Sequence, residues 1–150
     1  MIKSILKPLQ IAYYGILVAA LLFATLCIYL SKNNSLLLVE PSSLGGQIIQ
    51  SFVILYTIVS IAGGLFWFKT RCKKTKLIDD ENEKLGRYKH DALIRIVVIG
   101  VGMLFGIVAF YILGGFTSMI WCAAISAIGL IFCKPNEMRI QLELLKDEQL

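Results

Sequence analysis

The chain has 150 residues, of which 57% are hydrophobic and 17% charged, and its formal net charge is +5. Average soluble domains carry roughly 25% charged residues, so this composition argues against a soluble protein. Three long segments, 8–31, 41–68 and 96–133, contain no charged residue. Uncharged apolar segments of about 18 residues or more are typical of membrane-spanning helices. We therefore expect an integral membrane protein that forms one domain, residues 1–150.

The first two uncharged segments each predict one membrane-spanning helix, at about residues 10–30 and 46–68. Their lengths suit this role, because about 20 residues at a rise of 1.5 Å cross a hydrocarbon core about 30 Å thick. The segment at 10–30 is longer than the apolar region of a usual signal peptide. We therefore expect it to be retained as a span.

The third uncharged segment holds 38 residues, which is too long for one span. As a single helix it would extend for about 57 Å. Gly114 and Gly115 divide it, and paired glycines permit the backbone angles of a tight turn. We therefore predict a helical hairpin with spans at about 92–113 and 116–133. The expected fold is an all-α integral membrane protein with a bundle of four transmembrane helices.

The basic residues predict the orientation of these spans. Fourteen of the 15 Lys and Arg residues lie on one side of the expected membrane, and Lys32 alone lies on the other. Cytoplasmic flanks carry the excess of Lys and Arg, so both termini, the loop at 69–91 and the tail at 134–150 are expected in the cytoplasm. An apolar fourth span that ends in the segment "LIFCKPNEMRI" is a pattern that resembles several small bacterial membrane proteins. This resemblance implies a multi-pass protein of the bacterial inner membrane.

Small residues in the spans predict where helices approach each other. Helix association in a membrane relies on close packing of such residues. The candidate helix-packing residues are Gly15, Gly63, Gly64, Gly102 and Gly106. Packing inside the bundle is the first interpretation. The alternative is that the face around Gly102 and Gly106 forms an interface with a second copy or with a partner.

The second span also carries amides and hydroxyls. The candidate polar face consists of Gln47, Gln50, Thr57 and Ser60. Gln50 and Thr57 share a helical face at seven-residue spacing. Such side chains either bond to a neighbouring helix or line a polar cavity. No Asp, Glu, Lys or His lies at mid-membrane depth, which argues against a proton- or cation-coupled exporter.

The basic segment Lys69–Lys76 follows the second span directly. Basic residues next to a membrane bind anionic lipid headgroups, at about 1 kcal/mol each. We therefore expect the lipid bilayer as a partner of this segment. No nucleic-acid partner is expected, because headgroups compete for these side chains and Tyr88 is the one aromatic platform nearby.

A helix is predicted to begin near residue 80 and to continue into the third span, as a stalk in the cytoplasm. Asp80 resembles a helix cap. Four charges of alternating sign follow at a spacing of four residues: Glu83, Arg87, Asp91 and Arg95. We interpret them as a self-neutralising stripe in which Arg95 reaches back to Asp91 or extends to the headgroups. The alternative is a ligand or partner site formed by Arg87, His90, Asp91 and Arg95.

The tail is predicted to form an amphipathic C-terminal helix. Pro135 ends the fourth span, and Met138, Leu142 and Leu145 fall on one helical face. The tail is acidic overall, whereas the 69–91 loop is basic. Opposite charges indicate that the two elements dock, on each other or on a partner.

These features limit the classes of function that the sequence allows. One histidine and four scattered cysteines lack the spacing of a metal site, and His90 has no nucleophile at a suggestive distance in sequence. We expect no catalytic site, metal or cofactor. The leading interpretation is a small non-enzymatic membrane subunit or interaction module, with a second copy or another membrane protein as partner. The alternative is a small pore or transporter for a neutral or lipid-like solute, and a membrane-embedded enzyme comes third.

Overall fold

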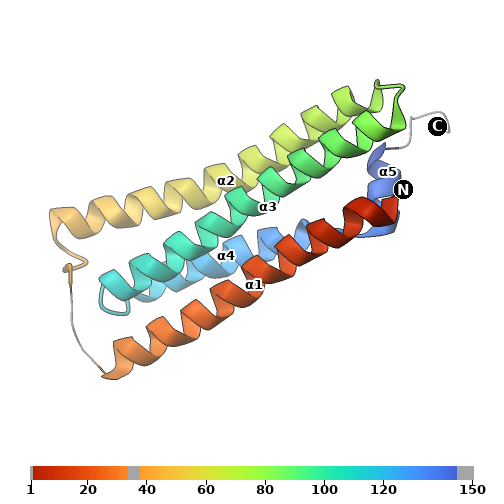
Figure 1. Ribbon diagram of the computed structural model, residues 1–150. Helices are drawn as coiled ribbons and strands as arrows, with labels where there is room; N and C mark the ends of the chain where they lie inside the picture. The colour runs from red at the N-terminus through yellow and green to blue at the C-terminus, as the bar shows by residue number, and fades with distance from the viewer. Residues whose placement is uncertain (1, 34–37, 145–150) are drawn as a thin grey trace.

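The protein is all-helical in the part of the chain described by the computed structural model, residues 2–33 and 38–144 (Figure 1). The five helices are α1 Ile2–Asn33, α2 Leu44–Lys76, α3 Glu81–Ile112, α4 Thr117–Phe132 and α5 Glu137–Leu144. The first four run alongside one another as an elongated bundle, and α5 lies at one end. The N-terminus of α1, the C-terminus of α2 and the start of α3 lie at the same end.

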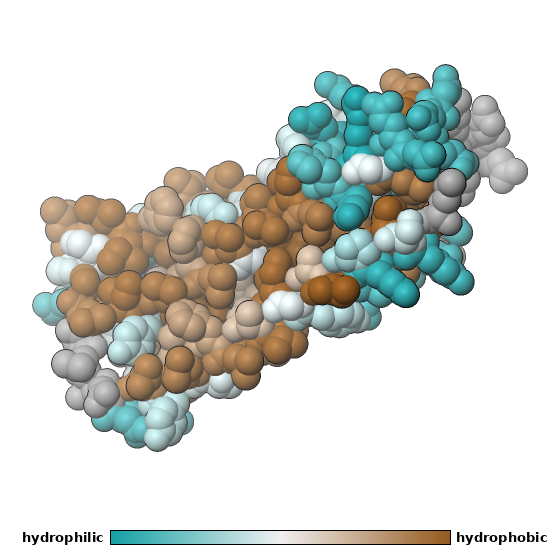
Figure 2. Space-filling model, in the orientation of Figure 1, coloured by the Kyte–Doolittle hydropathy of each residue, from teal (hydrophilic) through white to brown (hydrophobic). Residues whose placement is uncertain are grey.

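Helix α3 is the centre of the bundle. It packs against α1, α2 and α4, and α2 also packs against α4. Half of the most apolar window of α3 is buried, against 17% for the corresponding windows of α1 and α2. The buried side chains of α3 include Ile96, Ile99, Met103 and Ile107. Because α1 and α2 bury little apolar surface, the sides of the molecule are hydrophobic, and polar residues gather at its ends (Figure 2). This distribution suits a helical bundle surrounded by lipid.

Three helices, α1, α2 and α3, are long and apolar enough to cross a membrane, and a fourth span is present if α4 and α5 count together. Helix α4 has 16 residues and extends for about 24 Å, less than the usual hydrocarbon thickness. The axes of α4 and α5 differ by 72° at the break between them. The structure therefore shows three to four spans where four are expected. It also extends the helices well beyond the expected span boundaries at the polar end.

The predicted glycine turn is confirmed. Gly114 and Gly115 have φ values of 65° and 89°, in the left-handed region that favours glycine. Their amides bond to the carbonyls of Tyr111 and Phe110, at 3.2 and 2.9 Å. The turn therefore ends α3 and reverses the chain into α4.

The expected loop at 69–91 is mostly helical. Helix α2 continues through the basic segment to Lys76, and four residues, 77–80, connect it to α3. The side chain of Asp80 accepts a 3.0 Å hydrogen bond from the amide of Asn82. The predictions of an Asp80 cap and of a helix beginning near residue 80 are thus confirmed. The basic side chains of Lys69–Lys76, which the sequence predicts in a loop, therefore belong to the last turns of α2.

The predicted apolar face of the C-terminal helix is wrong. Met138 and Leu142 are 68% and 63% exposed, whereas Ile140 and Leu144 are buried. The reason is the bend after α4: it turns α5 across the end of the bundle, where α5 contacts α1 and α2. The face that meets these helices is set by this bend and by the packing. Leu145 and the rest of the tail lie outside the described residues.

Candidate functional site

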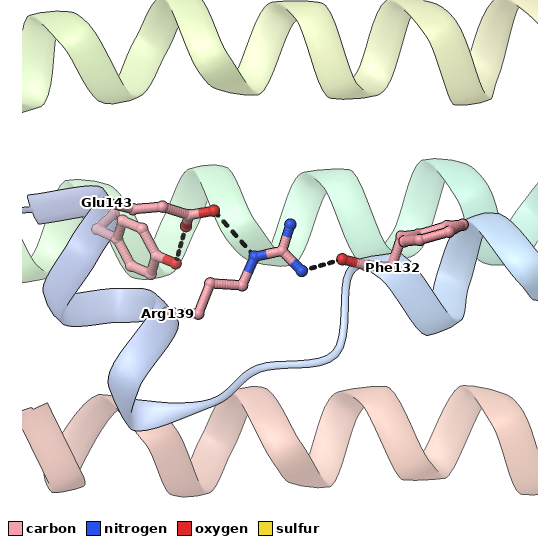
Figure 3. A network of polar contacts seen from close by, with 4 residues as sticks. Phe132, Arg139 and Glu143 are labelled. Atoms are coloured by element: carbon pink, nitrogen blue, oxygen red, sulfur yellow. Dashed lines mark hydrogen bonds and ion pairs between the residues drawn. The ribbon is translucent and has the colours of Figure 1, made fainter.

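A hydrogen-bond network ties α5 to the bundle at the polar end (Figure 3). The Tyr88 hydroxyl on α3 donates to Oε2 of Glu143 at 2.5 Å. Nε of Arg139 donates to Oε1 of the same carboxylate at 3.1 Å, and the Arg139 guanidinium also donates to the carbonyl of Phe132 at the end of α4. The Glu143 carboxylate therefore joins α5 to α3, and Arg139 joins α5 to the end of α4. We call the unit formed by residues 69–76, 81–91 and 137–144 the platform.

Tyr88 is the buried member of this network, with 3% of its surface exposed. It lies outside the expected span at 92–113. Burial, and secondly the hydrogen bond to Glu143, raise the pKa of Tyr88 above its usual value. The hydroxyl therefore remains a proton donor at neutral pH. The docking expected between the tail and the stalk is observed, and a neutral donor carries it rather than the opposite net charges.

Arg95 is buried beside the network. Only 4% of its surface is exposed, and its guanidinium carbon lies 3.6 Å from the centre of the Phe68 ring. Within the described residues, its Nε has no hydrogen-bond partner. Removing an ion from water costs several kcal/mol, and a cation–π contact returns about 2 kcal/mol. The stacking therefore compensates only part of the cost of burying this charge.

Arg95 lines a groove of about 720 Å³ between the C-terminal part of α2 and α5. The groove joins apolar and cationic side chains. Its apolar lining is Leu65, Phe68, Leu77 and Leu142, its cationic lining is Lys69, Lys73, Lys76, Arg95 and Arg139, and Cys72 and Glu143 complete it. We call it the Arg95 groove. Its composition suits a ligand that has both an anionic and an apolar part.

The four residues of the predicted cytoplasmic site are not brought together. Arg87 pairs with Glu83 at 2.7 Å, with side chains 62% and 50% exposed. His90 is 73% exposed, and its Nδ1 lies 3.5 Å from Asp91. Arg95 points away from both into the protein. The structure therefore places His90 beside Asp91, and Arg87 and Arg95 on different sides of α3.

Helical geometry explains this separation. At 3.6 residues per turn, each step of four residues rotates a side chain by about 40° around the helix axis. Arg95 is two such steps from Arg87, about 80° away. Arg87 therefore faces solvent while Arg95 faces α2. Of the predicted stripe, only Glu83 and Arg87 form an ion pair; no ion pair joins Asp91 to Arg95.

The candidate polar face of α2 divides into two parts. Nε2 of Gln47 and of Gln50 donates to the carbonyls of Ser42 and Pro41, at 3.2 and 3.0 Å, and so holds the preceding turn against α2. Thr57 and Ser60 are buried further along the helix, where the Ser60 hydroxyl donates to the Thr57 carbonyl at 3.1 Å. The Thr57 hydroxyl has no hydrogen-bond partner among the described residues. Gln47 and Gln50 therefore stabilise the turn before α2, and Thr57 and Ser60 lie in the interior of the bundle.

The candidate packing glycines fall into two groups, with close and with loose contacts. A methyl group on Gly106 would lie 2.8 Å from the backbone nitrogen of Ala123 on α4, and one on Gly102 would lie 3.2 Å from Tyr56 on α2. These two glycines therefore serve packing within the chain. Within the chain, α2 and α4 cover both positions.

The other three glycines make looser contacts. A methyl group on Gly64 would meet Ile99 at an ordinary 3.9 Å, and one on Gly15 or Gly63 would meet nothing within 4 Å. A close approach that the sequence analysis missed is at Gly100, where a methyl group would lie 2.7 Å from Ile16 on α1. Gly100 could have been recognised from its spacing, two residues before Gly102.

All four cysteines are free and buried, and burial raises the pKa of Cys72, in the Arg95 groove, to about 12. This thiol is therefore a poor nucleophile at neutral pH. No cluster of three or more His, Cys, Asp or Glu side chains suited to a metal occurs in the described part of the chain.

Sequence reasoning missed most of the Arg95 groove. Its lining residues Phe68, Arg139 and Glu143 were not identified as site residues, and neither was Tyr88 of the adjacent network; only Arg95 and the segment Lys69–Lys76 were. A usable signal was present at Arg95, a permanent charge at the edge of a 38-residue uncharged segment. Comparisons with protein-family models, curated proteins and solved structures found no match to this chain.

Proposed function

We propose that this chain is a non-enzymatic multi-pass membrane protein that acts as a subunit or interaction module, and that the platform is its contact surface. In this proposal α1 to α4 are four spans of a bacterial inner membrane, and both termini and the platform lie in the cytoplasm. The excess of Lys and Arg at the platform end supports this orientation. Helix α4, at about 24 Å, spans with local thinning of the bilayer.

One observation carries the proposal: the polar end is a packed tertiary unit. A topology anchor needs only basic residues next to a span. Here Tyr88 is buried under α5, and the Glu143 carboxylate accepts hydrogen bonds from two helices. Ordering a further helix in this way costs conformational entropy that membrane insertion does not require. A fixed surface next to the membrane is what a protein partner would recognise.

The hydrogen bonds of Gln50 favour this function over the alternative of a pore or transporter. Gln50 bonds to the Pro41 carbonyl at 3.0 Å, so its amide already has a partner. For a transport function through this face, Gln50→Leu would abolish solute flux in reconstituted liposomes. Under the proposed function, the variant and the original chain give the same flux.

The testing experiment isolates the full chain from its native membrane in mild detergent and determines the mass of the assembly by native mass spectrometry. We expect a heteromeric complex. Glu143→Gln should release the partner, because the carboxylate no longer holds α5 in place, while circular dichroism still reports the long helices. Glu40→Gln is the matched control, since Glu40 is an exposed carboxylate before α2, at the end of the bundle away from the platform (Figure 1). A monomer without partner, or a symmetric ring around a polar lumen, would contradict the proposal.

A further inference from the structure

We propose that the Arg95 groove binds the phosphate of an anionic phospholipid from the adjacent leaflet, with Arg95 as the buried anchor. This inference goes beyond the proposed function, because it depends on the membrane location of the helices and not on any protein partner. It assigns a ligand class to a site that the basic segment Lys69–Lys76 alone does not define.

The first step of the argument is the state of Arg95. Its guanidinium is permanently charged, and more than nine-tenths of the residue is buried. The Phe68 ring covers one face of the guanidinium, at 3.6 Å, which leaves the N–H groups on its edges as donors. Nε has no hydrogen-bond partner among the described residues. A planar fork of donors fixed by an aromatic ring is suited to bidentate binding of a phosphate.

The second step is that the acid in the groove is already used. Both oxygens of Glu143 accept hydrogen bonds, one from Tyr88 and one from Arg139. Glu143 is the only carboxylate that lines the groove, within the residues that the structure describes. The charge of Arg95 therefore has no partner in the groove, although a carboxylate lies in the same lining.

The third step is the excess of positive charge around Arg95. Lys69 and Lys73 are four residues apart on α2 and line the same groove, and Arg139 lines it from α5. A second groove of about 480 Å³ at this end, between α1, α3 and α5, provides a comparison. Its charged lining is balanced, with Lys3 and Lys84 opposite Glu81 and Glu137. Among the described residues, the lining of the Arg95 groove has five basic side chains against one acidic side chain, so it favours an anion.

The fourth step identifies a lipid as the source of the phosphate. Lys69 directly follows the uncharged segment 41–68, most of which belongs to α2, so the groove lies where the apolar surface ends. Hydrophobic and hydrophilic surfaces meet toward this end of the molecule (Figure 2). Leu65 and Phe68 form an apolar wall on the membrane side, beside Lys69. A phospholipid has its phosphate at this level and its acyl chains along such a wall.

The experiment measures lipid retention by the isolated full chain. The protein is purified in detergent, mixed with equal amounts of phosphatidylglycerol and phosphatidylcholine, and analysed by native mass spectrometry. We expect one phosphatidylglycerol to be retained, with at least about tenfold preference over phosphatidylcholine, as for a charge-assisted bond to a buried group. Arg95→Gln should reduce retention by about tenfold or more.

The controls separate the site from general attraction. Arg87→Gln removes an arginine of the same helix that is 62% exposed and paired with Glu83, and it should leave retention unchanged. If Arg95→Gln does not fold, Lys73→Gln serves as the second test variant, with an expected loss of lipid retention of about fivefold. Because no partner is present, failure here is distinguishable from failure of the proposed function.

Three outcomes would overturn the inference. The first is equal retention by Arg95→Gln and the original chain. The second is equal retention of phosphatidylglycerol and phosphatidylcholine. The third is displacement of the lipid by millimolar inorganic phosphate or by an acidic peptide, which would show that the groove serves a soluble anion or a protein segment instead.

Discussion

The hydroxyl of Tyr88 on α3 donates a 2.5 Å hydrogen bond to the carboxylate of Glu143 on α5, and so joins two residues that are 55 positions apart in the sequence. Through this bond the end of the chain becomes part of the helical bundle. Most other polar contacts of the polar end link residues within one turn of the same helix. The stability of the platform therefore depends strongly on one pair of side chains.

Tyr88→Phe removes only the hydroxyl and should loosen α5. A hydrogen bond to a charged group contributes about 1.5–3 kcal/mol, and we expect a loss of this order in the local stability of α5. Hydrogen–deuterium exchange of residues 137–144 measures it. Tyr14→Phe, at an α1 position that is 47% exposed, is the matched control. Unchanged exchange in α5 would show that the hydrogen bond contributes nothing.

The same bond predicts a dependence on pH. Burial and the bond to Glu143 raise the folded-state pKa of Tyr88 above its unfolded value of about 10. The stabilisation is therefore complete below about pH 10 and is lost as the pH rises toward the folded-state pKa. Exchange of α5 should accelerate above pH 10 in the original chain, beyond the intrinsic effect of base. Tyr88→Phe should lack this additional acceleration, and parallel profiles would refute the linkage.

The exposed ion pair between Arg87 and Glu83 should matter little. Its nitrogen–oxygen distance is 2.7 Å, but both side chains are at least half exposed, where such pairs contribute about 0.5 kcal/mol or less. Arg87→Ala should therefore change the free energy of unfolding, measured by denaturant titration in detergent micelles, by no more than this. A loss of 2 kcal/mol, the scale of a buried network, would reveal a role that the structure does not show.

Gly106→Ala should destabilise the bundle. The added methyl group would lie 2.8 Å from the Ala123 nitrogen and 2.9 Å from its Cβ, so α3 and α4 must move apart. Overpacking of this kind costs about 1–3 kcal/mol. Gly15→Ala is the matched control, because its methyl group meets nothing within 4 Å, and alanine favours the helix. Unfolding titrations should therefore move in opposite directions for the two variants.

Cysteine labelling tests the orientation of the spans. The four native cysteines are buried, and the pKa of Cys72 is raised to about 12, so they should react slowly with maleimide. Lys74→Cys and Lys32→Cys introduce exposed thiols at opposite ends of the bundle. In intact cells an impermeant maleimide should label only the variant at position 32, and permeabilisation should add the variant at position 74. The reverse pattern would invert the topology.

Helices and turns followed from local features of the sequence. The uncharged segments and the pair Gly114 and Gly115 determine the backbone conformation of adjacent residues only. The apolar helices and the turn could therefore be predicted from the sequence. The helix start at Asp80 is of the same kind, because a cap bonds to an amide two residues away. Helix ends were less predictable: α2 continues to Lys76, since charged residues near a span do not interrupt helical hydrogen bonding.

The candidate site depended on contacts that sequence spacing does not encode. The bond between Tyr88 and Glu143 exists because α5 bends by 72° across the end of the bundle. The same bend buries Ile140 and Leu144 in place of Met138 and Leu142. Residues spaced by four also do not stay on one face of a helix, because each step rotates the side chain by about 40°. Arg95 therefore lies on a different face of α3 from Arg87.

The central position of α3 has a consequence for synthesis of the protein. Helices α1 and α2 precede α3, the helix against which both pack, and so they leave the ribosome before it does. Until α3 is present, the α1 side chains that are buried in the bundle, among them Leu9, Tyr13 and Ala20, remain uncovered by it. Gly100 of α3, against which Ile16 of α1 packs, is also absent. Assembly of the bundle therefore waits for the C-terminal half of the chain. A nascent chain that ends at residue 80 contains α1 and α2 but lacks the helix on which both pack.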